Sequence, residues 1–170
     1  MIILINGATH SGKKLLAQKL LEKYKYPYLS IDHLKMGLIR SGNTTLTPCD
    51  DDKLLPFLWN IVKEIIKTAI ENNQNLIVEG AYIPFDFKDS FSKEYLEHIK
   101  YICIVFSENY INENFDEIIK NRSVIENRLY ENELTKEFLI DEHKSFLYGC
   151  KKYSLDYILV DENYDVTYEI

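Results

Sequence analysis

The sequence predicts an α/β fold, a three-layer sandwich in which about five parallel strands are covered by helices on both faces. Short, uninterrupted apolar runs alternate along the chain with longer amphipathic segments, which is typical of repeated strand–helix units. The 170 residues are 46% hydrophobic and 28% charged, enough to build one core but too few for two domains of typical size. No linker rich in Pro, Gly or Ser divides the chain, so we expect a single domain over residues 1–170.

Five segments are strand candidates, because uninterrupted apolar and β-branched residues favour strands that are buried on both faces. The four clearest are Ile2–Asn6, Asn75–Glu79, Tyr101–Phe106 and Tyr157–Val160, and a weaker one covers Tyr26–Ile31. Buried strands of this kind predict a parallel sheet.

Helical periodicity follows the first strand and returns after residue 47. Lys13–Tyr24 carries its leucines on one face and its lysines on the other, as an amphipathic helix does. Thr47 and Pro48 followed by Asp50–Asp52 predict the capped start of a long helix that continues to Ala69, since acidic residues favour a helix N-terminus. Pro56, near the first turns, predicts a kink.

The segment from Ser107 to Tyr153 predicts two or three helices, with breaks at Asn112–Asn114 and Asn132. It carries Arg122 and Arg128, and we expect region 108–135 to act as a lid whose closure brings guanidinium groups onto a transferring phosphate. Ordinary surface ion pairs are the alternative interpretation of both arginines.

Charge and composition exclude several classes of protein. The formal charge of −7 and pI near 5.1 argue against a nucleic-acid-binding or membrane-surface protein that depends on unspecific attraction. The apolar opening Met1–Ile5 is far too short to span a bilayer, so we expect a cytoplasmic protein without an anchor. The three cysteines, Cys49, Cys103 and Cys150, have no close pairing, which suits reduced thiols.

A phosphate-binding loop directly follows the first strand. Its residues are Gly7, Ala8, Thr9, His10, Ser11, Gly12 and Lys13. This is the glycine, glycine and lysine spacing of a Walker A loop, in which backbone amides surround phosphate oxygens and the lysine reaches the β- and γ-phosphates. A plain glycine-rich turn is the structural alternative. A dinucleotide-binding turn is excluded, because the chain has no G-x-G-x-x-G.

The position after Lys13 departs from that pattern. A Ser or Thr hydroxyl coordinates magnesium there in Walker A loops, but this chain has Lys14, and an ammonium cannot bind a metal. Three interpretations stay open: Lys14 contacts phosphate directly, carboxylates elsewhere hold magnesium through water, or the chain binds nucleotide without catalysis.

Two further segments complete the predicted site. Glu79 ends an apolar strand, where a carboxylate can hold Mg²⁺ and its waters, and Gly80 would let the next turn pass close to the terminal phosphate. Asp32 follows the weak strand and could orient or deprotonate an acceptor hydroxyl, with Lys35 and Arg40 holding an anionic acceptor. Glu79 could merely end a strand, and Asp32 could merely cap a helix.

Together these segments resemble P-loop small-molecule kinases of the adenylate-kinase-like superfamily, and Tyr28–Arg40 with Val78–Gly80 resembles bacterial proteins named adenylate or 2-phosphoglycerate kinases. The resemblance implies a P-loop NTPase-type fold, ATP with Mg²⁺ as phosphoryl donor, an acceptor bound between segment 32–47 and the lid, and adenine near Asp161–Tyr164. The chain lacks the Asp-Gly-Phe-Pro-Arg run of true adenylate kinases, which makes AMP a less expected acceptor.

We therefore expect an ATP-dependent phosphotransferase acting on a small hydroxyl- or phosphate-bearing metabolite, with no nucleic-acid or membrane partner. A nucleotide-binding sensor or partner-binding module with little kinase activity is the main alternative, motivated by Lys14. A kinase of toxin or antibiotic type is a third. The sequence indicates neither the acceptor nor the oligomeric state.

Overall fold

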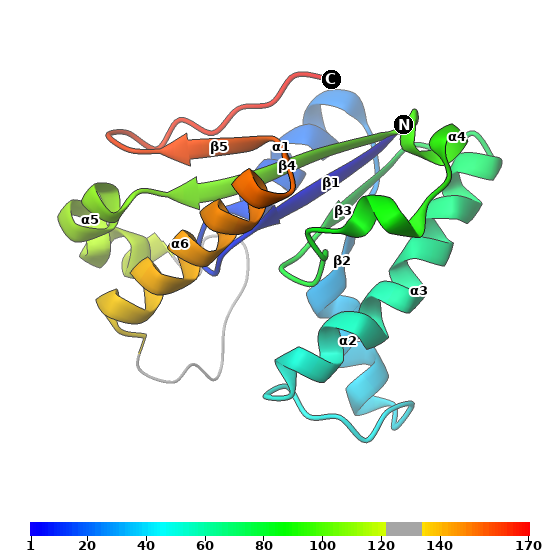
Figure 1. Cartoon of the computed structure of the whole chain (residues 1–170), viewed down its shortest axis with the longest axis horizontal. Helices are drawn as coiled ribbons and strands as arrows, with labels where there is room; N and C mark the ends of the chain where they lie inside the picture. Colours follow the sequence, from blue (N-terminus) through cyan, green and yellow to red (C-terminus); the bar gives the residue numbers. More distant parts are fainter. Residues whose placement is uncertain (122–133) are drawn as a thin grey trace.

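The structure is a computed structural model of the chain and describes residues 1–121 and 134–170. At its centre is a five-stranded sheet with strand order β2-β3-β1-β4-β5, in which every neighbouring pair is parallel (Figure 1). The strands are β1 (Ile2–Gly7), β2 (Tyr28–Ser30), β3 (Leu76–Glu79), β4 (Ile99–Phe106) and β5 (Tyr157–Val160). The predicted parallel α/β sandwich is thus confirmed.

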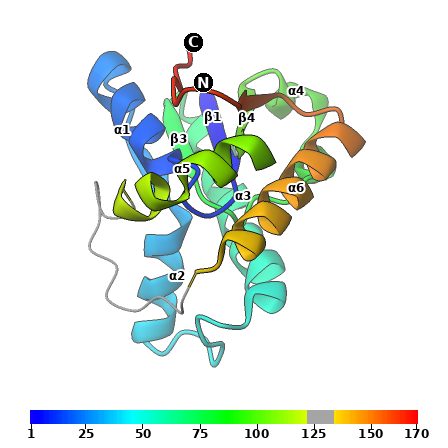
Figure 2. The same ribbon diagram turned by 90° about the vertical axis from the view of Figure 1, so that its left-hand side faces the viewer.

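Helices connect and cover these strands. They are α1 (Lys13–Tyr24), α2 (Ile31–Arg40), α3 (Asp51–Glu71), the 3₁₀ turn η1 (Phe87–Ser90), α4 (Lys93–Leu96), α5 (Glu108–Lys120) and α6 (Lys136–Lys152). Figure 2 shows α1 on one side of the strands and α3 on the other. This arrangement is a three-layer sandwich, and it explains why the strands read as continuous apolar runs.

Alternate residues of β1 enter two separate hydrophobic clusters, one on each face of the sheet. Ile2 and Leu4 belong to the cluster that α3 covers, and Ile3 and Ile5 belong to the cluster that α1 covers. All four side chains are fully buried. Because side chains alternate along a strand, the unbroken apolar run of β1 supplies both clusters.

Helix α3 begins close to its predicted start but is not capped as expected. Asp50 is the N-cap residue, yet its side chain makes no capping bond; its carboxylate instead accepts hydrogen bonds from the backbone amide and the hydroxyl of Thr47. The helix runs on through Pro56 in its second turn to Glu71. Pro56 costs it a hydrogen bond, and the buried apolar face of the helix outweighs that loss.

The predicted break at Asn112–Asn114 is confirmed as a kink inside α5, where Asn114 has the non-helical φ/ψ values −119° and 17°. The predicted break at Asn132 lies outside the described residues. The described part of the predicted lid, α5, buries Tyr110, Ile111 and Ile118 against the sheet.

The segment that follows β5 returns along α1 (Figure 1). Val166 is buried in the α1-side cluster and accepts a hydrogen bond from Lys19. Glu169 binds Lys23 and Tyr24 of the same helix. Residues 161–170 therefore cover α1 without forming a helix.

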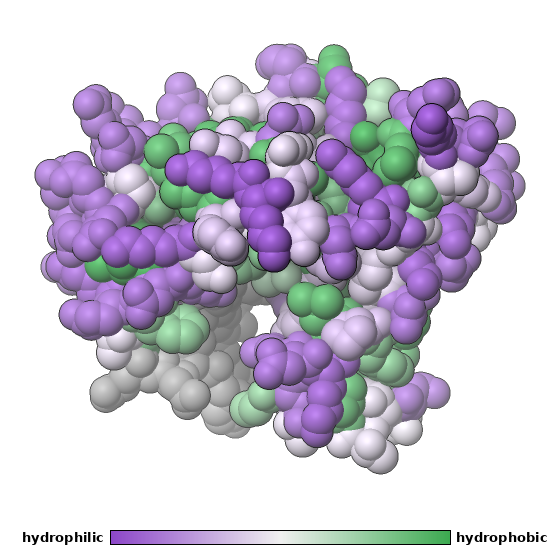
Figure 3. All heavy atoms as spheres, viewed as in Figure 1, coloured by the Kyte–Doolittle hydropathy of each residue, from purple (hydrophilic) through white to green (hydrophobic). Residues whose placement is uncertain are grey.

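On the face shown in Figure 3, hydrophilic residues predominate and hydrophobic residues form small groups between them. Among the described residues, no helix is long and apolar enough to cross a membrane.

Candidate active site

The segment between β1 and α1 is curled, as the glycine spacing predicts. Gly7, His10 and Gly12 all have positive φ angles, of 147°, 58° and 87°, and the Ser11 amide donates to the Ala8 carbonyl at 3.3 Å. A Cβ on Gly7 would lie 2.5 Å from the Ile104 carbonyl of β4. The first glycine is therefore required by the close approach of two backbones.

Lys13, the first residue of α1, folds back over this loop. Its Nζ donates to the carbonyls of Gly7 at 2.9 Å and Ala8 at 2.6 Å. Burial lowers the pKa of Lys13, and the carboxylates of Glu79, Asp32 and Glu142 partly oppose that shift. The ammonium thus lies above the loop and is surrounded by acidic groups from three other elements.

Glu79 lies at the carboxyl end of β3, beside β1, where it is paired in register with Ile5. Its side chain is fully buried, and among the described residues neither carboxylate oxygen has a hydrogen-bond partner. Burial raises the pKa of Glu79, while the nearby Ser30 hydroxyl, Lys13 and Lys14 act in the opposite direction. A buried carboxylate with both oxygens available is costly for the fold, which indicates a functional reason for its presence.

Three charged residues meet beside the loop, two of them from the start of α2. Lys14 Nζ lies 3.7 Å from one oxygen of Asp32, and Lys35 Nζ lies 3.7 Å from the other. Both lysine side chains are only 14% exposed. The structure therefore brings Asp32, predicted to contact the acceptor, next to Lys14 at the start of α1.

Two residues that the sequence did not single out for the site extend this cluster. Tyr82 follows β3; its hydroxyl donates to Asp51 at the start of α3 and accepts from Lys35 Nζ at 2.7 Å. Burial and the Asp51 carboxylate raise the pKa of Tyr82, so the phenol stays protonated. A chain of contacts thus joins Lys14, Asp32, Lys35, Tyr82 and Asp51.

Helix α6 holds the loop at Thr9 through two neighbouring side chains. Glu142 accepts a hydrogen bond from the Thr9 amide at 3.0 Å, and His143 Nε2 lies 3.3 Å from the Thr9 carbonyl. The Phe106 amide donates to His143 Nδ1 at 2.8 Å, so the proton of the neutral imidazole is on Nε2 and points at Thr9. Burial lowers the pKa of His143 to about 3, which keeps the ring neutral.

Tyr164, in the segment after β5, covers the end of the loop. A Cβ on Gly12 would lie 1.9 Å from the Tyr164 hydroxyl, and the ring meets Phe106 edge-on at 6.0 Å. Asp161, predicted near the adenine, is exposed in the same segment. The loop thus has an aromatic neighbour of the kind that could pack against a base.

The remaining predicted residues lie apart from the cluster or outside the described residues. Arg40 is exposed, eight residues or about 12 Å of helix beyond Asp32. A Cβ on Gly80 would lie 2.9 Å from Ile31, so this glycine lets the end of β3 pack against the start of α2. Arg122 and Arg128 fall in the segment that the structure does not describe.

The residues present fit Mg²⁺ only in part. Within residues 1–121 and 134–170, no group of three or more His, Cys, Asp or Glu side chains could hold a metal ion. The two unpartnered oxygens of Glu79 are suited to bind an ion or its waters. The ammonium of Lys14 stands at the start of α1, where a hydroxyl would be a direct ligand.

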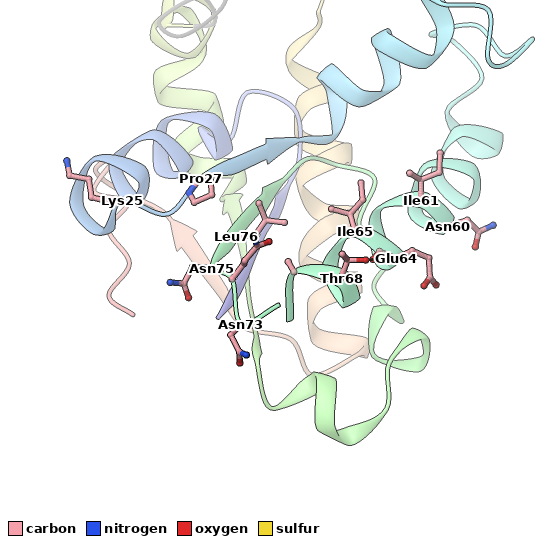
Figure 4. Close-up of a pocket in the computed structure, with 12 residues that line it drawn as sticks. Lys25, Pro27, Asn60, Ile61, Glu64, Ile65, Thr68, Asn73, Asn75 and Leu76 are labelled. Carbon is pink, nitrogen blue, oxygen red and sulfur yellow. Dashed lines mark hydrogen bonds between the residues drawn. The ribbon is translucent and has the colours of Figure 1, made fainter. Parts of the chain in front are cut away.

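A cavity of the described chain lies away from this cluster. It has a volume of about 880 Å³ and lies at the amino ends of β2 and β3, beside α3 (Figure 4). Its walls include Lys25, Asn60, Glu64 and Leu76. None of the described residues of the predicted site lines it. Most of them lie at the carboxyl ends of the strands, the usual location of ligand sites in open parallel sheets.

Solved structures with a similar fold include several kinases. The chain is similar to a gluconokinase from Sinorhizobium meliloti 1021, with a TM-score of 0.50 and 15% identity over 94% of this chain and 81% of that one. It is similar to a sugar kinase from Janibacter sp. HTCC2649, with a TM-score of 0.55 and 13% identity over 94% and 84%. The chain shares the fold of these kinases. A third similar structure is the Pnkp1/Rnl/Hen1 RNA repair complex, with a TM-score of 0.56 and 13% identity over 89% of this chain and 45% of that one. No protein-family model matches the chain, and no curated protein matches it by sequence.

The site residues that sequence reasoning missed gave weak local signals. His143 lies on the same face of α6 as Leu139 and Cys150. A histidine on an apolar helix face is in most proteins an ordinary core residue, so its position alone did not indicate a site. Glu142 and Tyr164 act on a loop more than a hundred residues earlier in the chain. These residues reach the loop only in the folded chain.

Proposed function

We propose that this protein is an ATP-dependent phosphotransferase that acts on a small hydroxyl-bearing metabolite. One observation carries the proposal: the Lys13 ammonium lies over a curled, glycine-bearing loop with the Glu79 and Asp32 carboxylates within its electrostatic reach. An ammonium above backbone amides suits a polyphosphate, and carboxylates beside it suit the proton transfer and cation binding that phosphoryl transfer needs.

In this proposal the loop and Lys13 hold the β- and γ-phosphates of ATP. Lys13 would exchange its bonds to the Gly7 and Ala8 carbonyls for bonds to phosphate oxygens, which removes some of the desolvation cost that now lowers its pKa. Any Mg²⁺ bound to the nucleotide would be held by Glu79 through water and would neutralise charge on the phosphates.

Asp32 is the proposed base for the acceptor. The acceptor hydroxyl oxygen would attack the γ-phosphorus, the bond from that phosphorus to the β-phosphate oxygen would break, and ADP would leave while the hydroxyl proton passes to Asp32. Lys35 and Tyr82 would orient the acceptor, since they already contact each other and Asp32 or Asp51. A hydroxyl-bearing acceptor fits this mixture of acid, base and phenol better than a purely anionic one.

The test combines nucleotide binding with turnover. Lys13→Ala should weaken ATP binding by at least about tenfold, because bonds to a charged partner contribute about 1.5–3 kcal/mol. Asp32→Asn and Glu79→Gln should keep ATP binding within about threefold and cut phosphotransfer by at least about a hundredfold. Isothermal titration and an ADP-release assay with a panel of sugars, sugar acids and polyols would measure both.

Lys23→Ala is the matched control, since Lys23 lies on the same helix but pairs with Glu169 on the exposed side. It should leave binding and turnover unchanged. Unchanged ATP binding by Lys13→Ala would contradict the proposal.

Lys14 favours a second candidate function, a nucleotide-binding module without meaningful turnover. An ammonium occupies the place of the metal-binding hydroxyl, and the Glu142 carboxylate already receives one loop amide. If ATP binds but no acceptor is phosphorylated, and Lys14→Thr creates turnover, this second function is the better description.

A further inference from the structure

The position of Lys14 relative to the two carboxylates of the site has a consequence for metal dependence. Lys14 is the second residue of α1, and its Nζ lies 3.7 Å from Asp32 Oδ2. Its charge also acts on Glu79 at the end of β3. The ammonium is therefore held in the region between these two acidic side chains and the phosphate-binding loop.

This location is where a divalent cation would otherwise be bound in a P-loop site. The hydroxyl at this position of a Walker A loop is a magnesium ligand, and an acid at the end of a neighbouring strand supports the same ion. Here Glu79 is fully buried with two unpartnered oxygens among the described residues, while the hydroxyl is replaced by a positive charge. The Lys14 ammonium thus supplies a positive charge beside Glu79, a carboxylate that is placed to bind a cation.

The charges of the surrounding side chains are consistent with this. Lys13, Lys14 and Lys35 face Asp32, Glu79 and Glu142 around the loop. A hydroxyl in place of Lys14 would leave one fewer positive charge beside these carboxylates. The ammonium supplies that charge permanently, at 14% exposure, where solvent screens it weakly.

We propose that the Lys14 ammonium takes the place of magnesium at the nucleotide phosphates, so that this chain binds ATP almost equally well with and without the metal. The proposal rests on the proposed function, since it concerns the same nucleotide site. Lys14 would exchange its contact with one Asp32 oxygen for phosphate oxygens, and the other Asp32 oxygen would stay beside Lys35. Lysine is suited to this role as a compact charge with three donors.

The experiment measures ATP affinity by isothermal titration, once with Mg²⁺ and once with EDTA. The unaltered protein should show affinities within about threefold of each other in the two conditions. Lys14→Met, which keeps the apolar stem but removes the charge, should weaken metal-free binding by about ten- to a hundredfold, the loss expected for bonds to a charged group. Lys14→Thr should weaken metal-free binding similarly and regain affinity when Mg²⁺ is added.

Two further variants keep the result interpretable. Lys14→Arg retains the charge and should keep metal-free binding, and Lys63→Thr on α3, whose amine donates to Asn60 away from the site, should change nothing. Thermal melting of each variant would confirm that it is folded.

The outcomes separate this inference from the proposed function. ATP binding that needs Mg²⁺ in the unaltered protein, or metal-free binding that is unchanged in Lys14→Met, overturns the role of Lys14 and leaves the phosphotransferase proposal standing. Absence of ATP binding in both conditions overturns the proposed function, and the role of Lys14 with it.

Discussion

Replacing Glu79 by glutamine should make the protein more stable while it impairs the proposed reaction. The carboxylate is fully buried and, among the described residues, without a hydrogen-bond partner. Its pKa is raised by burial even with Lys13 and Lys14 nearby, so the ionised form is disfavoured in the folded protein. Glu79→Gln resembles the protonated form and removes that penalty.

The expected gain is about 1–3 kcal/mol, because glutamine cannot ionise and each unit by which a carboxyl pKa is raised corresponds to about 1.4 kcal/mol. For a domain of this length, each kcal/mol corresponds to about 2–4 °C in melting temperature, so the variant should melt about 2–12 °C higher near neutral pH.

The gain should depend on pH in a defined direction. The folded-state pKa of Glu79 lies above its unfolded value of 4.5, so folding takes up a proton in the interval between the two. The stability contributed by this group therefore falls as pH rises through that interval. Below the unfolded pKa, Glu79 is neutral in both the folded and the unfolded state, and the advantage of Glu79→Gln should vanish.

Urea unfolding followed by the fluorescence of Trp59, the single and buried tryptophan, would measure the difference from acid to neutral pH. A variant that is less stable than the unaltered protein at neutral pH, or a gain that is the same at every pH, would refute the argument that the buried charge is only partly compensated.

Two further predictions concern the loop. His143→Gln should lower stability by about 1–3 kcal/mol through its lost bond to Thr9. The pKa of His143 is about 3 in the folded protein and 6.5 in the unfolded one, so the unaltered protein should lose stability as pH falls from 6.5 to 3. Urea titrations of the variant at several pH values should lack this loss of stability. Gly12→Ala should weaken ATP binding and cost about 1–3 kcal/mol, since φ is 87° and the new Cβ meets Tyr164. The matched Gly37→Ala, inside α2 with nothing within 4 Å, should instead stabilise by about 0.5–1 kcal/mol in thermal melts; equal effects of the two glycine changes would contradict the role given to Gly12.

The sequence predicted those features that depend on local order along the chain. The β1–loop–α1 unit was found because an apolar strand, two spaced glycines, a lysine and an amphipathic helix follow one another within 24 residues. Glu79 was found because it ends an apolar run. The weak second strand was predicted too long, since Ile31 is buried but begins α2, and an apolar residue at such a junction fits either element.

The contacts that complete the site could not be predicted in this way. Tyr82, Glu142 and Tyr164 reach the site only through the folding of residues that are far apart in sequence. Short elements such as η1 and α4 carry too few residues for a periodic pattern. Both limits reflect tertiary packing, which local propensity does not encode.

The contacts of α6 with Thr9 place one negative charge on the loop between β1 and α1 before any ligand binds. The Glu142 carboxylate accepts the Thr9 amide, while His143 and the packing of Gly149 against Phe85 keep the helix in place. An incoming phosphate that takes this amide must therefore displace a resident anion, so binding there is an exchange of one anion for another. Anions with a single charge should compete poorly in such an exchange, and the loop should therefore bind multiply charged ligands in preference to them.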